Sequence, residues 1–378
     1  MATRPTWAEI SLKNLRKNFD FLRKKVGDGV NICAVVKADA YGHGATRCAL
    51  ALQEQGAHWF GVTSLDEAIP LREAGIQGRI LLMTGFWPGE EDELLRLGLT
   101  PTIWTVKQIS LLEKAAAALG QQHAVHLKID TGMGRLGVSP KELPEVLAAL
   151  RSSSHVRLEG LSTHLASSEV LDAASVDAQL KTFDGVRAAL RKEGFEPAIV
   201  HVANSCAILS RPQSWNNMVR PGITLYGYAL PLQREGRDIT EDVPPLKPVL
   251  NWKTHILSLR QMPADQALGY NGTYITKAPS RIAVLPVGYA DGLNRQLSSR
   301  GRVIVRGQYA PIVGRISMDL TLIDVTTVPA ATMGDEVILI GASGNLEISA
   351  REHATLAGTI PYEILCGISK RVPRKYTD

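Results

Sequence analysis

Short apolar segments alternate with longer amphipathic ones over the first two thirds of the chain. The apolar segments are too short for helices, and turn residues bound them, so we expect buried strands there. These predicted strands cover residues 32–36, 58–62, 79–84, 99–104, 123–129, 156–162, 198–203 and 218–225. Helical spacing of apolar residues characterises the intervening segments 44–55, 65–74, 105–119, 141–151 and 172–193. This alternation predicts parallel strands joined by right-handed crossovers.

A further helix is expected over residues 11–26, ahead of the first of these strands. Its apolar side chains are three or four residues apart: Leu12, Leu15, Phe19, Leu22 and Val26. Ser11 is placed to cap its amino end, and Gly27 to end it.

Eight predicted strands favour a (β/α)8 barrel of the TIM type over residues 11–240. An open doubly wound sheet gives a similar alternation, but the strand count favours the barrel. The pattern changes after residue 230, where prolines precede short strands at 250–260, 281–287, 302–306, 320–325 and 335–341. We therefore expect an α/β protein whose carboxy-terminal domain, residues 245–378 together with 1–10, is mostly β. Short helices are expected within it at 349–356 and 359–366.

Composition narrows the class of protein without identifying its chemistry. The 378 residues carry a net charge of +5, but the basic residues are scattered among acidic ones, so no nucleic-acid partner is expected. Four widely spaced cysteines predict neither a disulfide framework nor a metal site. No segment has the character of a signal peptide or a membrane span. We expect a cytoplasmic protein without membrane contact.

Lys37 is the most informative single residue, because it lies at the mouth of the first predicted strand. A desolvated lysine amine is a nucleophile suited to a Schiff base with an aldehyde cofactor. A barrel gathers the residues that follow its strands at one end. These include amine, hydroxyl, cationic and turn residues: Lys37, Tyr41, Arg135, His164, Asn204, Ser205, Arg220, Gly222 and Ile223. The set contains no carboxylate pair and suits an anionic, phosphorylated cofactor held over a lysine.

Several sequence blocks resemble bacterial alanine racemases, in one order along nearly the whole chain. The block Val35-Val36-Lys37-Ala38-Asp39-Ala40-Tyr41-Gly42-His43-Gly44 resembles the segment that attaches pyridoxal 5′-phosphate in that family. Similar blocks occur at residues 126–137, 201–205, 219–223, 269–270, 314–319 and 361–366. The resemblance implies a barrel, a carboxy-terminal β domain and a homodimer with shared active sites. It also implies interconversion of L- and D-alanine, which supplies D-alanine for peptidoglycan.

The resemblance also implies roles for individual residues toward the cofactor. Lys37 would hold pyridoxal 5′-phosphate, and Arg220 would face its ring nitrogen with His164 nearby. The phosphate would be held by Tyr41, Ser205, Gly222, Ile223 and Tyr362. Because a guanidinium keeps its proton, the ring nitrogen would stay unprotonated and the ring would be a weaker electron sink.

Two bases are needed for racemisation, one on each side of the α-carbon. The resemblance assigns them to Lys37 and to Tyr270 of the partner subunit, with His164 and Arg220 assisting the phenol. Tyr274 is a less favoured candidate, because Asn271 stands where relatives more often have glycine. Arg135 and Met318 would bind the substrate carboxylate, and Lys128 matches a lysine that can be carbamylated.

Alternative interpretations concern both motifs and function. Residues Gly132–Gly137 match the dinucleotide pattern G-x-G-x-x-G, but Ser139 and Pro140 interrupt the helix such a site needs, so we expect a loop presenting Arg135. His43, His123 and His126 are interpreted as structural.

The functional alternatives are a broad-specificity racemase, a barrel-type decarboxylase and a non-catalytic pyridoxal 5′-phosphate carrier. The bulk of Tyr362 favours a small substrate side chain.

Overall fold

Parallel strands close into a barrel in the larger of two structural units. The computed structural model describes residues 4–239 and 244–378. Residues 15–40, 45–239 and 244–247 form the barrel unit, and residues 4–14, 41–44 and 248–378 form the β unit. The barrel strands are β2 (Asn31–Val35), β3 (Trp59–Val62), β4 (Arg79–Leu82), β5 (Thr100–Ile103), β6 (His123–Lys128), β7 (Val156–Ser162), β8 (Ile199–His201) and β9 (Met218–Val219).

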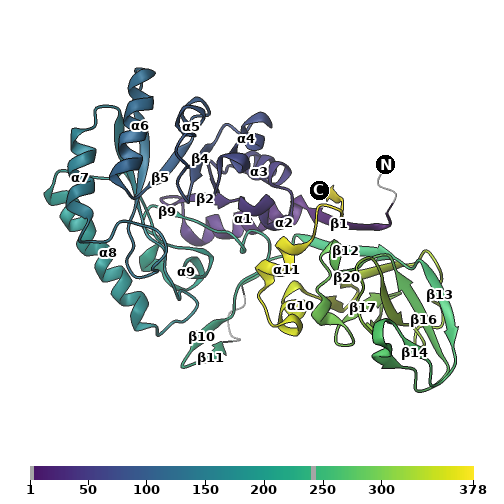
Figure 1. The fold of residues 1–378 in the computed structure, drawn as a ribbon. Helices are drawn as coiled ribbons and strands as arrows, with labels where there is room; N and C mark the ends of the chain where they lie inside the picture. The colour runs from purple at the N-terminus through teal and green to yellow at the C-terminus, as the bar shows by residue number, and fades with distance from the viewer. Residues whose placement is uncertain (1–3, 240–243) are drawn as a thin grey trace. The chain divides into compact units, whose positions relative to one another are not determined.

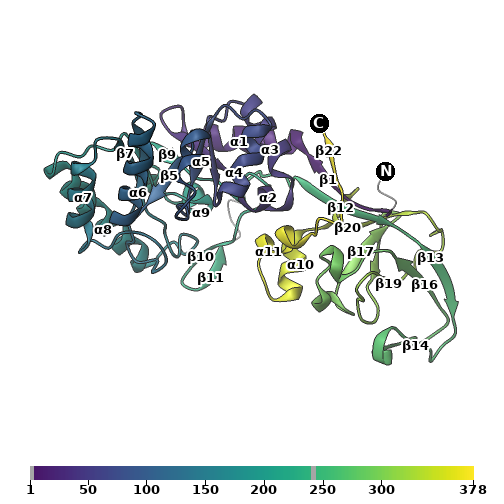
Figure 2. The same cartoon turned by 45° about the horizontal axis from the view of Figure 1, so that its top comes forward.

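Helices follow the strands and lie on the outside of the barrel, as α6, α7 and α8 show in Figures 1 and 2. They are α3 (Ala45–Glu54), α4 (Leu65–Glu73), α5 (Glu91–Arg96), α6 (Val106–Ala118), α7 (Leu143–Ser152), α8 (Ala174–Lys192) and α9 (Ser205–Ser210). β9 pairs with β2 and closes the barrel. The predicted (β/α)8 fold is confirmed.

The first helix, α1 (Leu12–Val26), forms for the reasons that its sequence suggests. The side chains of its predicted apolar stripe are all buried. Ser11 Oγ accepts a hydrogen bond from Asn14 N at 3.2 Å, which caps the amino end. Gly27 ends the helix with a φ of 80°, a conformation that glycine adopts without steric cost.

The β unit is built on a sheet to which both ends of the chain contribute. Its strand order is β18 (Gln308–Pro311), β17 (Arg302–Val305), β20 (Glu336–Ser343), β12 (Leu250–His255), β1 (Thr6–Ser11) and β22 (Arg374–Thr377), with β21 (Leu346–Ile348) paired to β20. A second sheet contains β13 (Ser258–Met262), β16 (Ser280–Leu285) and β19 (Thr321–Asp324). The remaining elements that bear on the site are β14 (Ala267–Leu268), β15 (Tyr274–Ile275), α10 (Ala350–Ala357) and α11 (Pro361–Gly367).

Two predicted strands differ from the observed ones. The segment 250–260 is two strands, because the chain leaves one sheet after β12 and enters the other at β13. The segment 218–225 is a strand only at its start. Pro221 lacks a backbone N–H, and the chain turns at Gly222, whose carbonyl accepts from Leu225 N. Strands β1, β22 and the hairpin of β10 (Leu232–Arg234) and β11 (Arg237–Ile239) were not predicted.

No helix among residues 4–239 and 244–378 is long and apolar enough to cross a membrane.

Asn18, a buried residue of α1, joins the helix to two other segments of the barrel unit. Its Nδ2 donates to Leu225 O at 2.9 Å and to Lys247 O at 2.8 Å, and its Oδ1 accepts from Lys247 N at 2.8 Å. We expect Asn18→Leu to lower the free energy of unfolding by about 1–3 kcal/mol, because one buried and two partly buried backbone groups lose their partner. Urea denaturation measures this, with Lys17→Ala on the exposed face of α1 as the control. An equal midpoint for both variants would contradict the assignment.

Candidate active site

Lys37 begins a left-handed turn directly after β2. The turn is α2 (Lys37–Gly42), and Ala38, Asp39, Ala40 and Tyr41 have φ values of 51°, 53°, 54° and 55°. Each non-glycine residue in this conformation costs about 1–2 kcal/mol, so surrounding contacts must hold the turn. Such strain is common where a fold positions a functional group, and Lys37 is the residue predicted for that role.

Glu67 on α4 supplies one of those contacts. Its Oε1 accepts from Ala38 N at 2.6 Å, while its Oε2 accepts from Thr63 N at 2.7 Å and Thr63 Oγ1 at 2.9 Å. Asp39 adds a second contact by accepting from Ala45 N at 2.8 Å. Glu67 therefore ties the residue after Lys37 to the end of the neighbouring strand β3.

Arg220 follows β9 and is buried at the carboxyl end of the barrel. Its Nη1 donates to His201 Nδ1 at 2.7 Å and to His201 O at 2.8 Å. Its Nη2 donates to Thr163 O at 2.9 Å and to Val202 O at 3.1 Å, and lies 3.5 Å from His164 Nδ1. The guanidinium is thus held by the ends of β7 and β8. Burial lowers the pKa of Arg220 to about 10, so it remains a cation at neutral pH.

Several basic residues near Lys37 act on one another electrostatically. Burial, then the charges of Arg220 and Arg135, lower the pKa of Lys128 to about 8. Burial, then Arg220 and Lys128, lower the pKa of His164 to about 3, with Arg135 and Lys37 contributing. His164 is therefore neutral at physiological pH. The mutual effects place Lys37, Lys128, Arg135, His164 and Arg220 in one electrostatic environment.

The loop that carries Arg135 is organised by Asp130. One carboxylate oxygen of Asp130 accepts from the backbone N–H groups of Gly132, Met133 and Gly134 at 2.9, 2.9 and 3.1 Å. Burial would raise the pKa of Asp130, but these bonds lower it overall. No helix begins on this loop, which agrees with its interpretation as a support for Arg135 rather than a dinucleotide site.

Ser205 and Gly222 meet after β8 and β9. Gly222 N donates to Ser205 Oγ at 2.9 Å, and Thr224 Oγ1 donates to the same oxygen at 3.2 Å. Ser205 is the first residue of α9, with Asn204 as its N-cap, and Ile223 follows Gly222 in the chain. Loops after the last two strands of a barrel, together with a helix amino terminus, suit a phosphate group.

The other predicted cofactor and substrate residues belong to the β unit. The rings of Tyr41 and Tyr362 lie 5.9 Å apart between centroids, and Tyr362 is on α11. Gly42 permits this approach, since a Cβ there would lie 2.4 Å from Leu365 O. Tyr270 and Met318 are both largely exposed, at 68% and 52%. Asn271 has a φ of 61°, so asparagine adopts the left-handed conformation directly after Tyr270.

The Met318 loop is held by an ion cluster that the sequence did not reveal. Arg371 Nη2 lies 2.6 Å from Asp319 Oδ1, and Arg4 Nη2 lies 2.9 Å from Asp291 Oδ2. The backbone N–H groups of Tyr289 and Ala290 donate to the carbonyls of Ser317 and Met318, each at 3.0 Å. These contacts present Met318 on a rigid support.

Comparison with known proteins places these features in a family. The alanine racemase N-terminal domain matches residues 10–230, and the alanine racemase C-terminal domain matches residues 249–376. The chain belongs to the alanine racemase family. It is 44% identical to the alanine racemase of Halothermothrix orenii over 374 residues, covering 99% of this chain and 97% of the relative. It is also 44% identical to that of Geobacter sulfurreducens over 382 residues, covering 100% and 98%.

Solved alanine racemase structures have the same fold. The enzyme of Streptomyces coelicolor A3(2) superposes with a TM-score of 0.93 at 34% identity, covering 100% of this chain and 99% of that one. The enzyme from D-cycloserine-producing Streptomyces lavendulae gives 0.92 at 34%, covering 100% and 98%. The resemblance expected from the sequence blocks is confirmed.

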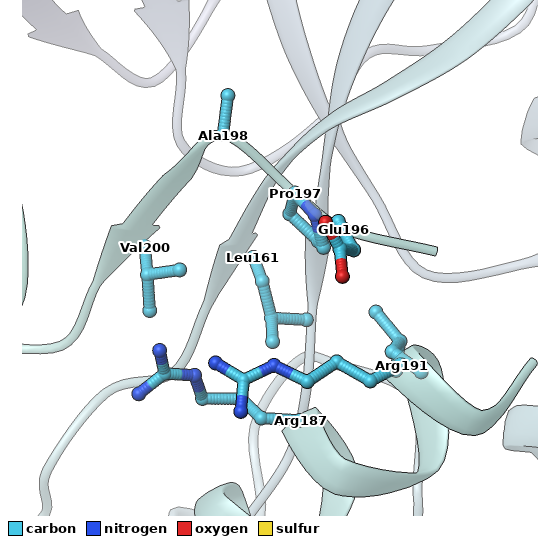
Figure 3. A pocket seen from close by; sticks show the side chains of 8 residues that line it. Leu161, Arg187, Arg191, Glu196, Pro197, Ala198 and Val200 are labelled. Carbon is cyan, nitrogen blue, oxygen red and sulfur yellow. The ribbon is translucent and has the colours of Figure 1, made fainter. Parts of the chain in front are cut away.

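A crevice elsewhere on the barrel lacks the predicted site residues of the alanine racemase family. It lies between α8 and the strands β7 and β8, where Figure 3 shows Arg187 and Arg191 extending beneath Leu161 and Val200. Arg187 Nη1 donates to Asn216 Oδ1 at 3.0 Å within the same region. The residues that line the crevice are Leu161, Arg187, Leu190, Arg191, Glu196, Pro197, Ala198 and Val200. The strand ends remain the candidate site.

We expect Glu67→Gln to weaken the binding of pyridoxal 5′-phosphate about tenfold. The amide keeps the shape of the side chain but loses an acceptor for Ala38 or Thr63, and one such bond to a charged group contributes about 1.5 kcal/mol. Absorbance titration of the cofactor-free protein measures the affinity. Glu73→Gln, at the exposed end of the same helix, is the matched control. Equal affinities of the two variants would show that Glu67 does not hold the Lys37 turn.

Proposed function

We propose that this protein interconverts L- and D-alanine with pyridoxal 5′-phosphate, using Lys37 and Tyr270 as the two bases. The observation that carries this proposal is the cationic environment around Lys37, with the buried Arg220 at its centre. The acidic residues near it are engaged by protein donors: Asp130 accepts three backbone hydrogen bonds, and Glu67 and Asp39 accept from backbone N–H groups. Such a site is chemically suited to a cofactor that carries a phosphate and a substrate that carries a carboxylate.

The residues present fit the cofactor. Both Nη atoms of Arg220 are used by protein acceptors, and no hydrogen bond of its Nε is recorded among the described residues. That N–H is therefore the donor available to a ring nitrogen. Ser205, Gly222 and Ile223 would hold the phosphate, and we propose the same role for Tyr41 and Tyr362. When bound, pyridoxal 5′-phosphate supplies an aldehyde that reacts with amines and a ring that acidifies the α-hydrogen of alanine.

Each base would act on one side of the α-carbon. The amine of Lys37 would accept or return the α-proton on one side, and the phenolate oxygen of Tyr270 of the partner subunit would do so on the other. A phenol has an ordinary pKa of about 10 and needs help to act as a base. Because Arg220 faces Nδ1 of the neutral His164, the proton of this imidazole is on Nε2, which would donate to the tyrosine oxygen and favour the phenolate. Arg135 and Met318 would orient the substrate carboxylate.

The same proposal covers the oligomeric state, the cellular compartment and the use of the product. We infer a homodimer whose subunits complete each other's sites, because Tyr270 and Met318 are largely exposed on the β unit. We propose that the enzyme acts in the cytoplasm and that its D-alanine serves peptidoglycan synthesis.

Enantiomer analysis after incubation with each L-amino acid tests this proposal. We expect D-alanine as the main product, no product from Lys37→Ala, and a fall in kcat of at least about 100-fold in Tyr270→Phe. Tyr274→Phe is the matched control and should retain activity.

Other results would identify the alternatives. Comparable conversion of many amino acids would indicate a broad-specificity racemase, and loss of carbon dioxide from the substrate would indicate a decarboxylase. Cofactor binding with no conversion would indicate a carrier. Undiminished conversion by Tyr270→Phe would remove the two-base assignment.

We further propose that Lys128 is carbamylated and orients Arg135. Burial and neighbouring cations lower the pKa of Lys128 to about 8, which increases the neutral amine that reacts with carbon dioxide. The product is a carbamate and a proton, so the modification replaces a positive charge by a negative one between two arginines. This change would relieve the repulsion that lowers the pKa.

A carbon-13 NMR experiment with labelled bicarbonate tests the modification. We expect one carbamate signal that is absent from Lys128→Arg and that grows as the pH rises through about 8, because deprotonation provides the reactive amine. Lys141→Arg, at an exposed position, should keep the signal. The same spectrum from wild type and Lys128→Arg would exclude carbamylation at this residue.

A further inference from the structure

A row of polar side chains leads from Arg220 into the interior of the barrel. Arg220 Nη1 lies 2.7 Å from His201 Nδ1, and His201 Nε2 lies 2.9 Å from His126 Nδ1. His126 Nε2 lies 3.5 Å from Glu159 Oε2 and has no hydrogen-bond partner in the described part of the chain. We call Arg220, His201, His126 and Glu159 the relay. All four side chains are buried.

Glu159 is anchored at the end of the barrel away from Arg220. Arg79, the first residue of β4, donates from Nη1 to Glu159 Oε1 at 2.8 Å, and its Nη2 lies 2.6 Å from Oε2. Arg79 is itself held over the Trp59 ring at 4.3 Å and donates to Thr100 Oγ1 at 2.9 Å. Arg157 Nη2 also donates to Glu159 Oε1, at 3.3 Å. The two shorter contacts with Arg79 keep the carboxylate ionised and fix its direction, whereas the longer contact with the exposed Arg157 adds little.

Strand β7 has two features that create room for the relay. Its pairing with β6 shifts from Val125↔Leu158 to His126↔Gly160, so Glu159 is the extra residue of a β-bulge. A bulge re-aims the side chain that it carries, and here that side chain is the buried carboxylate. At Gly160, a Cβ would lie 2.4 Å from Cγ of the His126 ring, so only glycine leaves space for the imidazole.

The proton positions in the relay follow from its two ends. Arginine donates and cannot accept, so His201 Nδ1 must accept and the proton of this ring is on Nε2. That Nε2–H donates to His126 Nδ1, which puts the proton of His126 on Nε2 as well, facing Glu159. Burial lowers the pKa of both histidines, so each is neutral. Because Arg220 can only donate and the ionised Glu159 can only accept, this is the one arrangement of protons that satisfies both ends of the relay.

The buried positive charge of Arg220 explains why a carboxylate at the other end of the relay matters. The protein partners recorded for this guanidinium in the described residues are backbone carbonyls and imidazoles, without a carboxylate in direct contact. A buried cation without a counter-charge is unfavourable. Glu159 supplies a negative charge through two polarised imidazole rings, and it strengthens His201 Nδ1 as an acceptor.

We propose that Glu159 is a positioning residue for Arg220, acting through His126 and His201 to hold the guanidinium at the cofactor position. His126, interpreted from sequence as structural, thereby becomes part of the site. The inference rests on the proposed function only in that Arg220 faces a cofactor ring. The relay itself exists whichever reaction the site performs.

Neutron crystallography of the cofactor-loaded enzyme tests the proton arrangement directly. We expect deuterons on Nε2 of both His126 and His201 and none on either Nδ1. A deuteron on His201 Nδ1, or a doubly protonated ring in the relay, would overturn the proposal. This measurement needs no variant and does not depend on racemase activity, so it decides the inference even if alanine is not the substrate.

Glu159→Gln tests the effect on the site, with Arg157→Gln as the matched control. Arg157 contacts the same carboxylate from its exposed side but does not touch the imidazoles. In Glu159→Gln we expect mixed histidine tautomers by nitrogen-15 NMR, an altered absorption band of the bound cofactor and a kcat lower by about tenfold with little change in KM.

We expect Arg157→Gln to match wild type in all of these measurements. Unchanged tautomers and absorption in a folded Glu159→Gln would overturn the proposal. If Glu159→Gln does not fold, Gly160→Ala removes the space for His126 without changing a charge, and it should produce the same altered absorption band. Wild-type absorption in Gly160→Ala would equally overturn the proposal.

Discussion

The burial of one guanidinium, that of Arg220, is the constraint on which the candidate site depends. To keep a cation at the carboxyl end of a packed barrel, the fold directs the carbonyls of Thr163, His201 and Val202 toward it. These carbonyls follow two different strands, so the guanidinium also determines how β7 and β8 end. Burial, and then the charge of Arg220, lower the pKa values of His164 and Lys128, so His164 is neutral and Lys128 is readily deprotonated. The protonation of these neighbouring side chains therefore follows from burial together with a nearby buried cation.

A second constraint is the left-handed turn that begins at Lys37. A strand that continued straight, or a right-handed helix, would send Tyr41 and Gly42 in other directions. The unfavourable backbone is compensated by Glu67, Asp39 and the close packing of Gly42 on Leu365. The placement of Lys37 is therefore coupled to that of Tyr41, because the same short segment carries both residues.

Much of this architecture could be predicted from sequence, because it depends on local periodicity. The apolar segments predicted each barrel strand, and strand ends predicted Lys37, Ser205 and Arg220 as neighbours in space. The failures have a physical pattern. In segment 218–225, strand pairing stops after Val219 although the apolar pattern continues. In segment 250–260 the apolar pattern also continues, but the segment divides into two strands that pair in different sheets. Glu67 and Glu159 have no local signal, because their roles come from contacts between separate β/α units.

Asp130 and Glu159 show how two acidic residues can serve a site that must bind anions. A carboxylate directly facing the cofactor position would repel a phosphate and a substrate carboxylate. Asp130 instead accepts hydrogen bonds from backbone N–H groups of its own loop. Glu159 is separated from Arg220 by two imidazole rings and is paired with Arg79. Asp130 organises the loop that carries Arg135, and Glu159 is linked to Arg220 through His126 and His201. The fold thus engages both carboxylates with protein donors, while the Nε–H of Arg220 remains the donor proposed for a ring nitrogen.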